Sequence, residues 1–213
     1  MIPPIIMDAI IYASLLSMLS TGLTLTYMTT KVPNFAHGDF AGLTTYISLM
    51  VVGVLGLNPY IGIVPGFLVG GLTALILYLF VLKPLLDRGA TYVILMIATI
   101  AFDMILFSAI NILADYLSNV YKLVTKLFIL RSYDFELFGQ PGVFLIAPLM
   151  AFLMVALLYL FLNKTKFGIA MKAAIENPSL AGVVGINVNL TYAVSWLLEF
   201  WGLTPISESC LDS

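Results

Sequence analysis

The chain has 213 residues, of which 62% are hydrophobic and 9% are charged, whereas a soluble domain is about 45–50% apolar and about 25% charged. So little polar surface excludes a water-soluble globule, and the net charge of −2 gives no basis for nucleic-acid binding. The single cysteine, Cys210, and the single histidine, His37, exclude an internal disulfide and metal sites built from several such residues. The composition predicts a polytopic membrane protein.

Five segments are long and apolar enough to cross a membrane, since about 20 residues of helix span about 30 Å of hydrocarbon. Helices are favoured over strands because each segment in lipid must satisfy its own backbone polar groups. A sixth segment begins near Leu190 and is cut short. The predicted fold is all-α, a transmembrane helix bundle with an incomplete sixth span and five full spans at residues 5–28, 35–57, 60–82, 92–114 and 143–162.

The basic residues predict the orientation of this bundle. The stretch before the first span holds no Lys or Arg and no cleavage site follows it, so a retained helix is favoured over a signal peptide. The first, third and fifth loops carry six basic residues and the second and fourth carry three, which places the N-terminus outside the cell. The six are Lys31, Lys83, Arg88, Lys164, Lys166 and Lys172.

The third predicted span carries glycines at intervals of four, at Gly62, Gly66 and Gly70. Small residues on one face let two helices approach closely in a membrane. The pattern favours packing inside one bundle over a dimer interface. Pro65 is expected to bend this helix.

The first predicted span carries a stripe of hydroxyl groups on one helical face, at steps of three and four. Such groups avoid lipid and either bond to neighbouring helices or line a polar path. Both interpretations remain open, with packing slightly favoured. The stripe consists of Ser14, Ser17, Thr21 and Thr24.

Asp103 lies near the middle of the fourth predicted span, where a bare carboxylate costs at least about 2.5–3.5 kcal/mol. Its side chain is therefore expected to face the bundle interior, to be protonated or to touch water. Thr99, Phe107 and Asn111 share its helical face. A functional role and a protonated carboxyl bonded to a neighbouring helix agree equally well with the sequence.

The segment Asn-Phe-Ala-His-Gly-Asp-Phe at residues 34–40 opens the second predicted span. Asn34 is expected to cap this helix, and the helix dipole favours the charge of Asp39 in its first turns. Gly38 permits a close approach or a local break, and broken helices are tolerated where they line a cavity. The simpler alternative is a capped helix entry with His37 at the membrane interface.

The loop at residues 163–189, here called the coupling loop, predicts two short cytoplasmic helices. The first covers residues 167–176, with Lys172 and Glu176 as an i,i+4 ion pair. Asn177 followed by Pro178 ends it.

The second short helix is expected to begin at a Ser179 cap and to end at Gly185. Two short helices between two spans are more than a connector needs. From spacing alone, a helix pair resting on the lipid surface is slightly favoured over a protein-docking element.

Three motifs, in matching order and spacing, resemble the permeases of branched-chain amino acid ABC importers, and the resemblance covers residues 5–198. The first is Thr21-Gly-Leu-Thr-Leu-Thr-Tyr27. The second, residues 34–40, is similar to the signature that follows the first span of that family. The third is Phe-Gly-Ile-Ala-Met-Lys-Ala-Ala-Ile-Glu-Asn-Pro at residues 167–178 with Gly185-Ile-Asn-Val, which resembles the family's coupling loop.

The resemblance implies a permease subunit of an ATP-driven importer for branched-chain or other apolar amino acids, multi-pass in the plasma membrane of a prokaryote. It implies no enzymatic activity and no cofactor in this chain, because ATP would be bound by partner subunits and the chain has no glycine-rich phosphate loop. The implied partners are a second permease subunit, two cytoplasmic ATPase subunits, an extracytoplasmic substrate-binding protein and membrane lipid, without nucleic acid.

Two sets of candidate residues follow, and neither contains a catalytic group or a metal ligand. The resemblance places the coupling loop in a cleft of the ATPase and tips its interpretation toward docking, through Phe167, Gly168, Ala170, Lys172, Glu176, Asn177, Pro178 and Gly185. The candidate translocation path consists of Ser14, Ser17, Thr21, Thr24, Asn34, His37, Gly38, Asp39 and Asp103. Of these, Asp103 belongs to no family motif.

The C-terminal end departs from the family pattern, in which a Gly/Ala-rich helix and further spans follow. Here Glu199 lies in a segment too short to cross comfortably, and a polar stretch comes after it. We expect a change of reading frame or a broken gene near Leu198. Residues 1–198 would then be an incomplete permease domain, and residues 199–213 an atypical polar tail.

Three alternatives to a working permease remain. A truncated chain would be an inactive fragment. A self-contained proton-coupled carrier using Asp103 would transport on a pH gradient without ATPase partners. An intramembrane enzyme is disfavoured because it needs a nucleophile with a base, or paired acids, and His37 lies at a span edge.

Overall fold

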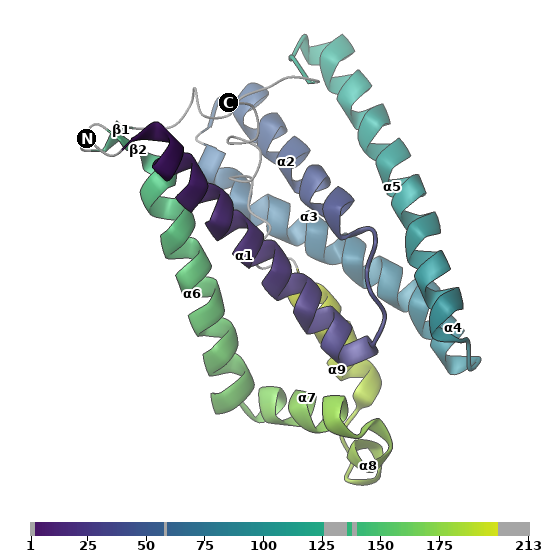
Figure 1. Ribbon diagram of the computed structural model, residues 1–213. Helices are drawn as coiled ribbons and strands as arrows, with labels where there is room; N and C mark the ends of the chain where they lie inside the picture. The colour runs from purple at the N-terminus through teal and green to yellow at the C-terminus, as the bar shows by residue number, and fades with distance from the viewer. Residues whose placement is uncertain (1–2, 58, 126–135, 138–139, 200–213) are drawn as a thin grey trace.

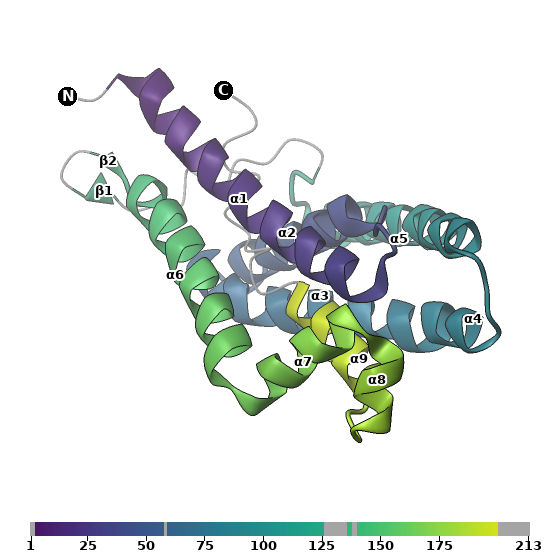
Figure 2. The ribbon, with the colours of Figure 1, turned by 60° about the horizontal axis from the view of Figure 1, so that its bottom comes forward.

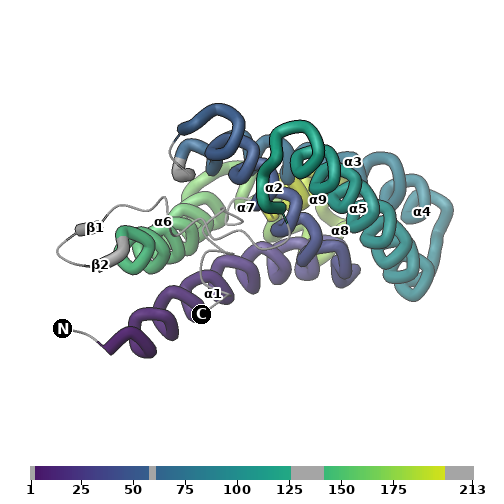
Figure 3. Tube along the Cα trace, turned by 90° about the horizontal axis from the view of Figure 1, so that it is seen from above, coloured from purple at the N-terminus to yellow at the C-terminus, as the bar shows by residue number. Residues whose placement is uncertain are grey.

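The structure, a computed structural model, describes residues 3–57, 59–125, 136–137 and 140–199. These residues form a bundle of helices, with α1, α5 and α6 running along its length (Figure 1). Figure 3 shows α1 and α6 on one side and α3, α4 and α5 on the other, with α2 and α9 between them. The helices are α1 (Pro4–Thr30), α2 (His37–Gly53), η1 (Pro59–Gly62), α3 (Ile63–Ile76), η2 (Leu77–Leu82), α4 (Lys83–Asp87), α5 (Tyr92–Tyr121), α6 (Gly142–Lys164), α7 (Lys166–Glu176), α8 (Pro178–Val183) and α9 (Val188–Leu198).

Two short strands complete the described elements. β1 (Glu136–Leu137) pairs antiparallel with β2 (Gln140–Pro141), directly before α6. The prediction of an all-α membrane bundle is confirmed in its class, since this pairing involves only two residues from each strand.

Four helical stretches in the described part of the chain are long and apolar enough to cross a membrane: Pro4–Thr30, Ile63–Asp87, Tyr92–Tyr121 and Gly142–Lys164. They coincide with four of the five predicted full spans. The remaining one, at residues 35–57, forms the 17-residue helix α2, which is about 26 Å long at 1.5 Å per residue. The number of full spans and the outside position of the N-terminus stay predictions.

The third span is continuous through α3, η2 and α4, and its irregularity lies away from the predicted place. Pro65 is the third residue of α3, where a helix has no acceptor for the backbone N–H that proline lacks, so a bend from a lost hydrogen bond is not expected there. Six residues of π-helix follow at η2. The wider π turn lets two consecutive side chains, Leu77 and Tyr78, both enter the core.

The glycines of α3 pack inside the bundle, as predicted. A Cβ on Gly62 would overlap Ser48 of α2, and a Cβ on Gly66 would lie 3.5 Å from Thr44 on the next turn of α2. One face of α3 therefore lies directly against α2, and these glycines are not free to form a dimer interface.

The main core joins α2, η2, α5 and α9. Phe40, Tyr78 and Trp196 are completely buried there, and the rings of Tyr78 and Trp196 stack with centroids 6.3 Å apart. Buried aromatic side chains of this size remove about 150–250 Å² each from solvent. A separate contact joins α1 to α6 through Ile11, Leu15, Val143 and Ala147. Together these contacts position α1, α2 and α9 around a buried polar cluster.

Candidate functional site

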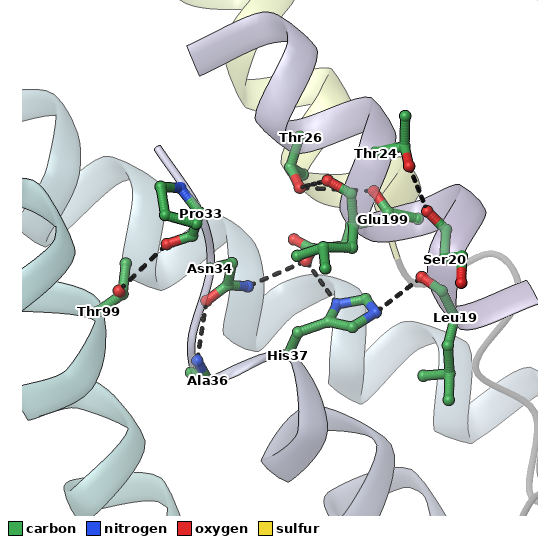
Figure 4. A network of polar contacts seen from close by, with 12 residues as sticks. Leu19, Ser20, Thr24, Thr26, Pro33, Asn34, Ala36, His37, Thr99 and Glu199 are labelled. Atoms are coloured by element: carbon green, nitrogen blue, oxygen red, sulfur yellow. Dashed lines mark hydrogen bonds and ion pairs between the residues drawn. The ribbon is translucent and has the colours of Figure 1, made fainter. Parts of the chain in front are cut away.

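A buried polar cluster of Asn34, His37 and Glu199 joins three segments (Figure 4). Asn34 lies between α1 and α2, His37 is the first residue of α2, and Glu199 directly follows α9. His37 Nδ1 lies 2.6 Å from Glu199 Oε1, and Asn34 Nδ2 donates to the same oxygen at 3.0 Å. The three residues are between 1% and 7% exposed. The cluster thus fastens α9 to both neighbouring helices.

The protons of this cluster follow from its geometry. His37 Nε2 lies 3.0 Å from the carbonyl oxygen of Leu19 in α1, which can only accept, so Nε2 carries a hydrogen. One proton then remains between Nδ1 and the carboxyl group of Glu199. An imidazolium with a carboxylate and a neutral imidazole with a carboxylic acid hold the same number of protons. Either form makes the pair neutral overall, which is how a buried pair avoids an uncompensated charge.

Close backbone packing completes the cluster. A Cβ on Gly22 of α1 would overlap the backbone carbonyl oxygen of Glu199, so α1 accepts the end of α9 only because Gly22 has no side chain. Glu199 Oε2 is buried and has no hydrogen-bond partner among the described residues.

Two predictions for the second-span segment are wrong. Asn34 does not cap α2. Its Oδ1 accepts from Ala36 N at 3.1 Å, while Ala36 occupies the cap position without a side-chain bond, because the Asn34 amide is directed to Glu199. Gly38 does not break the helix, since α2 is continuous from its first residue. A Cβ on Gly38 would meet nothing within 4 Å, so this exposed position is not a close approach within the described chain.

The predicted hydroxyl stripe of α1 does not lie in one environment. Ser14 is buried, Thr21 is half-buried, and Ser17 and Thr24 are exposed. Three of the hydroxyls donate to carbonyl oxygens one turn earlier in α1: Ser14 to Ile10, Thr21 to Ser17 and Thr24 to Ser20, at 2.6–2.7 Å. The hydrogen-bonding capacity of these three donors is thus used within α1. Because Ser17 and Thr24 are exposed, a path lined by all four residues would have to run partly along the outer surface of the described bundle.

The carboxyl groups of Asp39 and Asp103 are brought together by α2 and α5. Their charges are close enough to interact, and the neighbouring rings of Phe40 and Phe102 lie 6.0 Å apart between centroids. Both side chains are half-buried. Asp103 therefore lies beside an acidic residue of the neighbouring helix α2, and its role stays a prediction.

The predicted polar patch around Asp103 is only partly present. Thr99 is buried and donates to Met96 O at 2.8 Å and Pro33 O at 3.4 Å, which attaches α5 to the segment before α2. Phe107 and Asn111 are exposed, and the Asn111 amide donates to Phe107 O at 2.8 Å. These two side chains face away from the bundle.

The first helix of the coupling loop is anchored by its small residues. Thr165 caps α7 by accepting from Gly168 N at 2.9 Å. A Cβ on Gly168 would overlap the carbonyl oxygen of Phe161 and lie 2.6 Å from Leu162 Cα in α6. Met171 and Ala174 are fully buried on the same face, whereas Ala170 is half-buried. Gly168 thus holds α7 against α6 and is not part of an exposed docking face.

The second helix of the coupling loop, α8, projects from the bundle (Figure 2). Asn177, not the predicted Ser179, caps it by accepting from Leu180 N at 3.0 Å, because Pro178 occupies the first helical position. Ser179 Oγ donates to Asn177 Oδ1. Gly185, with φ of +90°, ends the turn after α8 as predicted.

The charged residues of the coupling loop also differ from prediction. Lys172 Nζ donates to Asn163 Oδ1 at 2.5 Å, and within the described residues the expected ion pair with Glu176 is absent.

The apolar residues of the coupling loop differ in exposure. The ring of Phe167 packs against the ring of Phe161, with centroids 6.1 Å apart. Three apolar side chains at the end of the projection are exposed: Leu180 by 60%, Val183 by 84% and Val184 by 74%.

Both residue sets lie inside one family match. A family model described as the permease component of the branched-chain amino acid transport system matches residues 5–199. The chain belongs to this permease family. The family consists of transporter membrane components and not of enzymes, and the long apolar helices of the described residues agree with a multi-pass membrane protein.

A curated relative agrees with this assignment. The chain is 45% identical over 195 residues to the probable branched-chain amino acid transport permease protein LivH of Methanocaldococcus jannaschii. The aligned part is 92% of this chain and 62% of the relative, so the chain spans about three fifths of the relative's length. No solved structure matches the chain. The permease family match ends at Glu199, so it contains the whole cluster of Asn34, His37 and Glu199.

Proposed function

We propose that this chain is the membrane-spanning permease subunit of an ATP-driven importer for branched-chain or other apolar amino acids. The family match over residues 5–199 carries the proposal. A second permease subunit, two cytoplasmic ATPase subunits and an extracytoplasmic binding protein would complete the importer. ATP would bind only to the ATPase subunits, and the odd-numbered loops with their basic residues would face the cytoplasm.

The proposed ATPase contact is the projecting α8. α8 lies at the end of the molecule opposite the N-terminus (Figure 1). Leu180 and Val183 of this helix, and Val184 directly after it, have exposed apolar side chains. Exposed apolar groups at a helix tip favour insertion into a groove of a partner protein. The buried face of α7 supports this, because Gly168 and Met171 hold the loop rigidly enough to transmit a force.

The proposed transmission route runs from α8 through α9 into the bundle. α9 has 11 residues, or about 16 Å of helix, and it leads from the coupling loop to Glu199. A displacement of α8 would therefore reach the bond of Glu199 with His37 at the start of α2. Alternating access requires such a link between the cytoplasmic loop and the helices around the path.

Co-purification with the ATPase subunit tests the docking proposal. Val183→Arg places a charge on the exposed tip, where no described contact is lost, and is expected to reduce ATPase capture at least tenfold. Val120→Arg is the matched control, since Val120 is 54% exposed at the other end of the bundle. Equal capture by both variants would show that α8 is not the docking element.

The pair of Asp39 and Asp103 favours a second candidate, a self-contained proton-coupled carrier. Two neighbouring carboxyl groups in the membrane-spanning part could bind and release a proton, as such a carrier requires. Uptake of labelled leucine into vesicles separates the candidates. A permease requires ATP and its ATPase, whereas a carrier responds to a pH gradient alone, and no uptake under either condition agrees with the inactive fragment expected from a frame change. The polar tail on which that expectation rests, residues 200–213, lies outside the described residues.

A further inference from the structure

We propose that a cavity at the outer end of α5 is a low-affinity site that receives the amino acid through its two charged groups. The cavity has a volume of about 580 Å³, which lies in the usual range of small-molecule sites. The proposal rests on the proposed function, which supplies the substrate class and places this end of α5 outside the cell. Figure 1 shows it at the end of the molecule opposite α7 and α8.

Opposite charges line this outer cavity. Asp115 and Lys122 both border it, with Ser118 and Asn119 between them. Within the described residues, Asp115 and Lys122 form no ion pair with one another. Their positions along the helix are separated by about 10.5 Å, from seven residues at 1.5 Å each. A ligand with one positive and one negative group, placed between the two side chains, would pair with both.

Lys122 borders this cavity from the end of α5, where the backbone takes a left-handed conformation. Lys122 has φ of +58°, a conformation that glycine usually adopts at this position. Its N–H donates to Leu117 O, and Leu123 N also reaches that oxygen, at 3.5 Å.

The wall of the outer cavity is attached to α2 at two points. The side chain of Leu123 packs directly against Gly53 of α2, so closely that a Cβ added to Gly53 would lie 2.6 Å from Leu123 Cδ1. Tyr46 Oη donates to Thr125 O at 3.0 Å. The residues after α5 are therefore folded back onto α2, and the cavity does not depend on an isolated helix end.

An amino acid has the complementary chemistry. Its carboxylate would pair with the Lys122 ammonium, and its ammonium with the Asp115 carboxylate. The hydroxyl of Ser118 and the amide of Asn119 would supply further hydrogen bonds, and Leu123 and Val124 would contact an apolar side chain. Since the charged groups are exposed to water, each pairing is expected to contribute no more than about fivefold in affinity.

The test compares three ligands on the purified full chain by ligand-observed NMR. The probes are L-leucine, L-leucinamide without the carboxylate, and 4-methylpentanoate without the ammonium. The chain is expected to prefer leucine over each analogue by about fivefold. Lys122→Gln should remove only the preference over leucinamide, and Asp115→Asn only the preference over 4-methylpentanoate.

Two further variants separate charge from folding. Lys122→Gly removes the ammonium while relieving the backbone conformation, so it should lose the same preference as Lys122→Gln in a fully folded chain. Lys31→Gln is the matched control, because Lys31 also has φ of +58° but ends α1 at the opposite side of the bundle, and it should leave all preferences unchanged.

The inference is overturned if leucine does not bind, or if the variants weaken all three ligands alike. It is also overturned if Lys122→Gln reduces only capture of the binding protein, since the cavity would then be a protein-docking face. ATP-driven uptake is measured separately. Absence of uptake by a chain that still shows the ligand preferences would count against the proposed function and leave the cavity site standing.

Discussion

The bond between His37 and Glu199 predicts how strongly α9 is fastened to the rest of the bundle. Glu199→Ala removes the shared proton and leaves His37 Nδ1 and the Asn34 amide facing a buried space, where these residues are 4–7% exposed. Removing one partner of a buried pair costs about 3–5 kcal/mol. We expect a loss of that size in the free energy of unfolding.

Glu199→Gln distinguishes the hydrogen bond from the space that the side chain fills. The Gln amide can donate to His37 Nδ1 in the neutral tautomer, in which Nε2 still donates to Leu19 O, but its nitrogen then takes the place of the oxygen that accepts from Asn34 Nδ2. The expected loss is about 1–3 kcal/mol, the cost of leaving one buried donor unpaired. The exposed Glu176→Ala on α7 is the control and should change stability by less than about 0.5 kcal/mol.

Denaturant unfolding in detergent micelles measures these differences, followed by tryptophan fluorescence because Trp196 is fully buried near the cluster. The expected order of stability is the unchanged chain, Glu199→Gln and then Glu199→Ala. Equal stability of Glu199→Ala and Glu176→Ala would refute the argument, because the buried pair would then contribute nothing to the fold.

Three further predictions concern separate contacts. Gly168→Val forces a side chain into the backbone of α6 and should lower the free energy of unfolding by at least about 1–3 kcal/mol, measured by thermal unfolding. Gly182→Val is the control and should not lower it, because a Cβ at Gly182 would have no atom within 4 Å. Asp103→Asn should stay within about 1 kcal/mol of the unchanged chain because an amide can donate to the nearby Asp39, while Asp103→Leu should cost about 1–3 kcal/mol. Equal effects would show that the two side chains do not stabilise one another. Lys122→Gly should raise the free energy of unfolding by about 1 kcal/mol, and a decrease would contradict the left-handed conformation found there.

Hydropathy was sufficient to place most of the helices, because lipid imposes length and apolarity on each crossing segment independently of its neighbours. Four predicted spans coincide with helices of sufficient length. The glycine face of α3 was likewise predictable, since small residues at a spacing of four have few roles besides close packing.

The polar contacts were less predictable because their partners are distant in sequence. Asn34 has the residue type of a helix cap, but its amide donates to Glu199, 165 positions away. Asp103 has its partner in Asp39, on a helix that the local pattern of α5 does not reveal. Glu199 itself was expected to begin an atypical polar tail, so local analysis provided no reason to expect it in the core, although the family match includes it.

The prediction of where α8 begins was wrong for a different, local reason. Asn177 and Ser179 are both good capping residues on either side of Pro178, and only the preference of proline for the first helical position decides between them. For Gly168 the sequence indicated a small residue at a contact, but the contact is with α6 of the same chain. A short side chain shows that something approaches closely without showing what approaches.

The π-helical segment η2 has a consequence for how this membrane helix tolerates changes in length. Deleting one residue from an α-helical span turns everything beyond it by about 100°, which would carry the buried face of that helix into lipid. In η2 the wide turn already contains a surplus residue, and Phe80 there is 75% exposed. Loss of Phe80 would tighten η2 toward ordinary α-helix, so the span could be shortened by one residue at this place while the residues on either side keep their orientation toward α5 and α9.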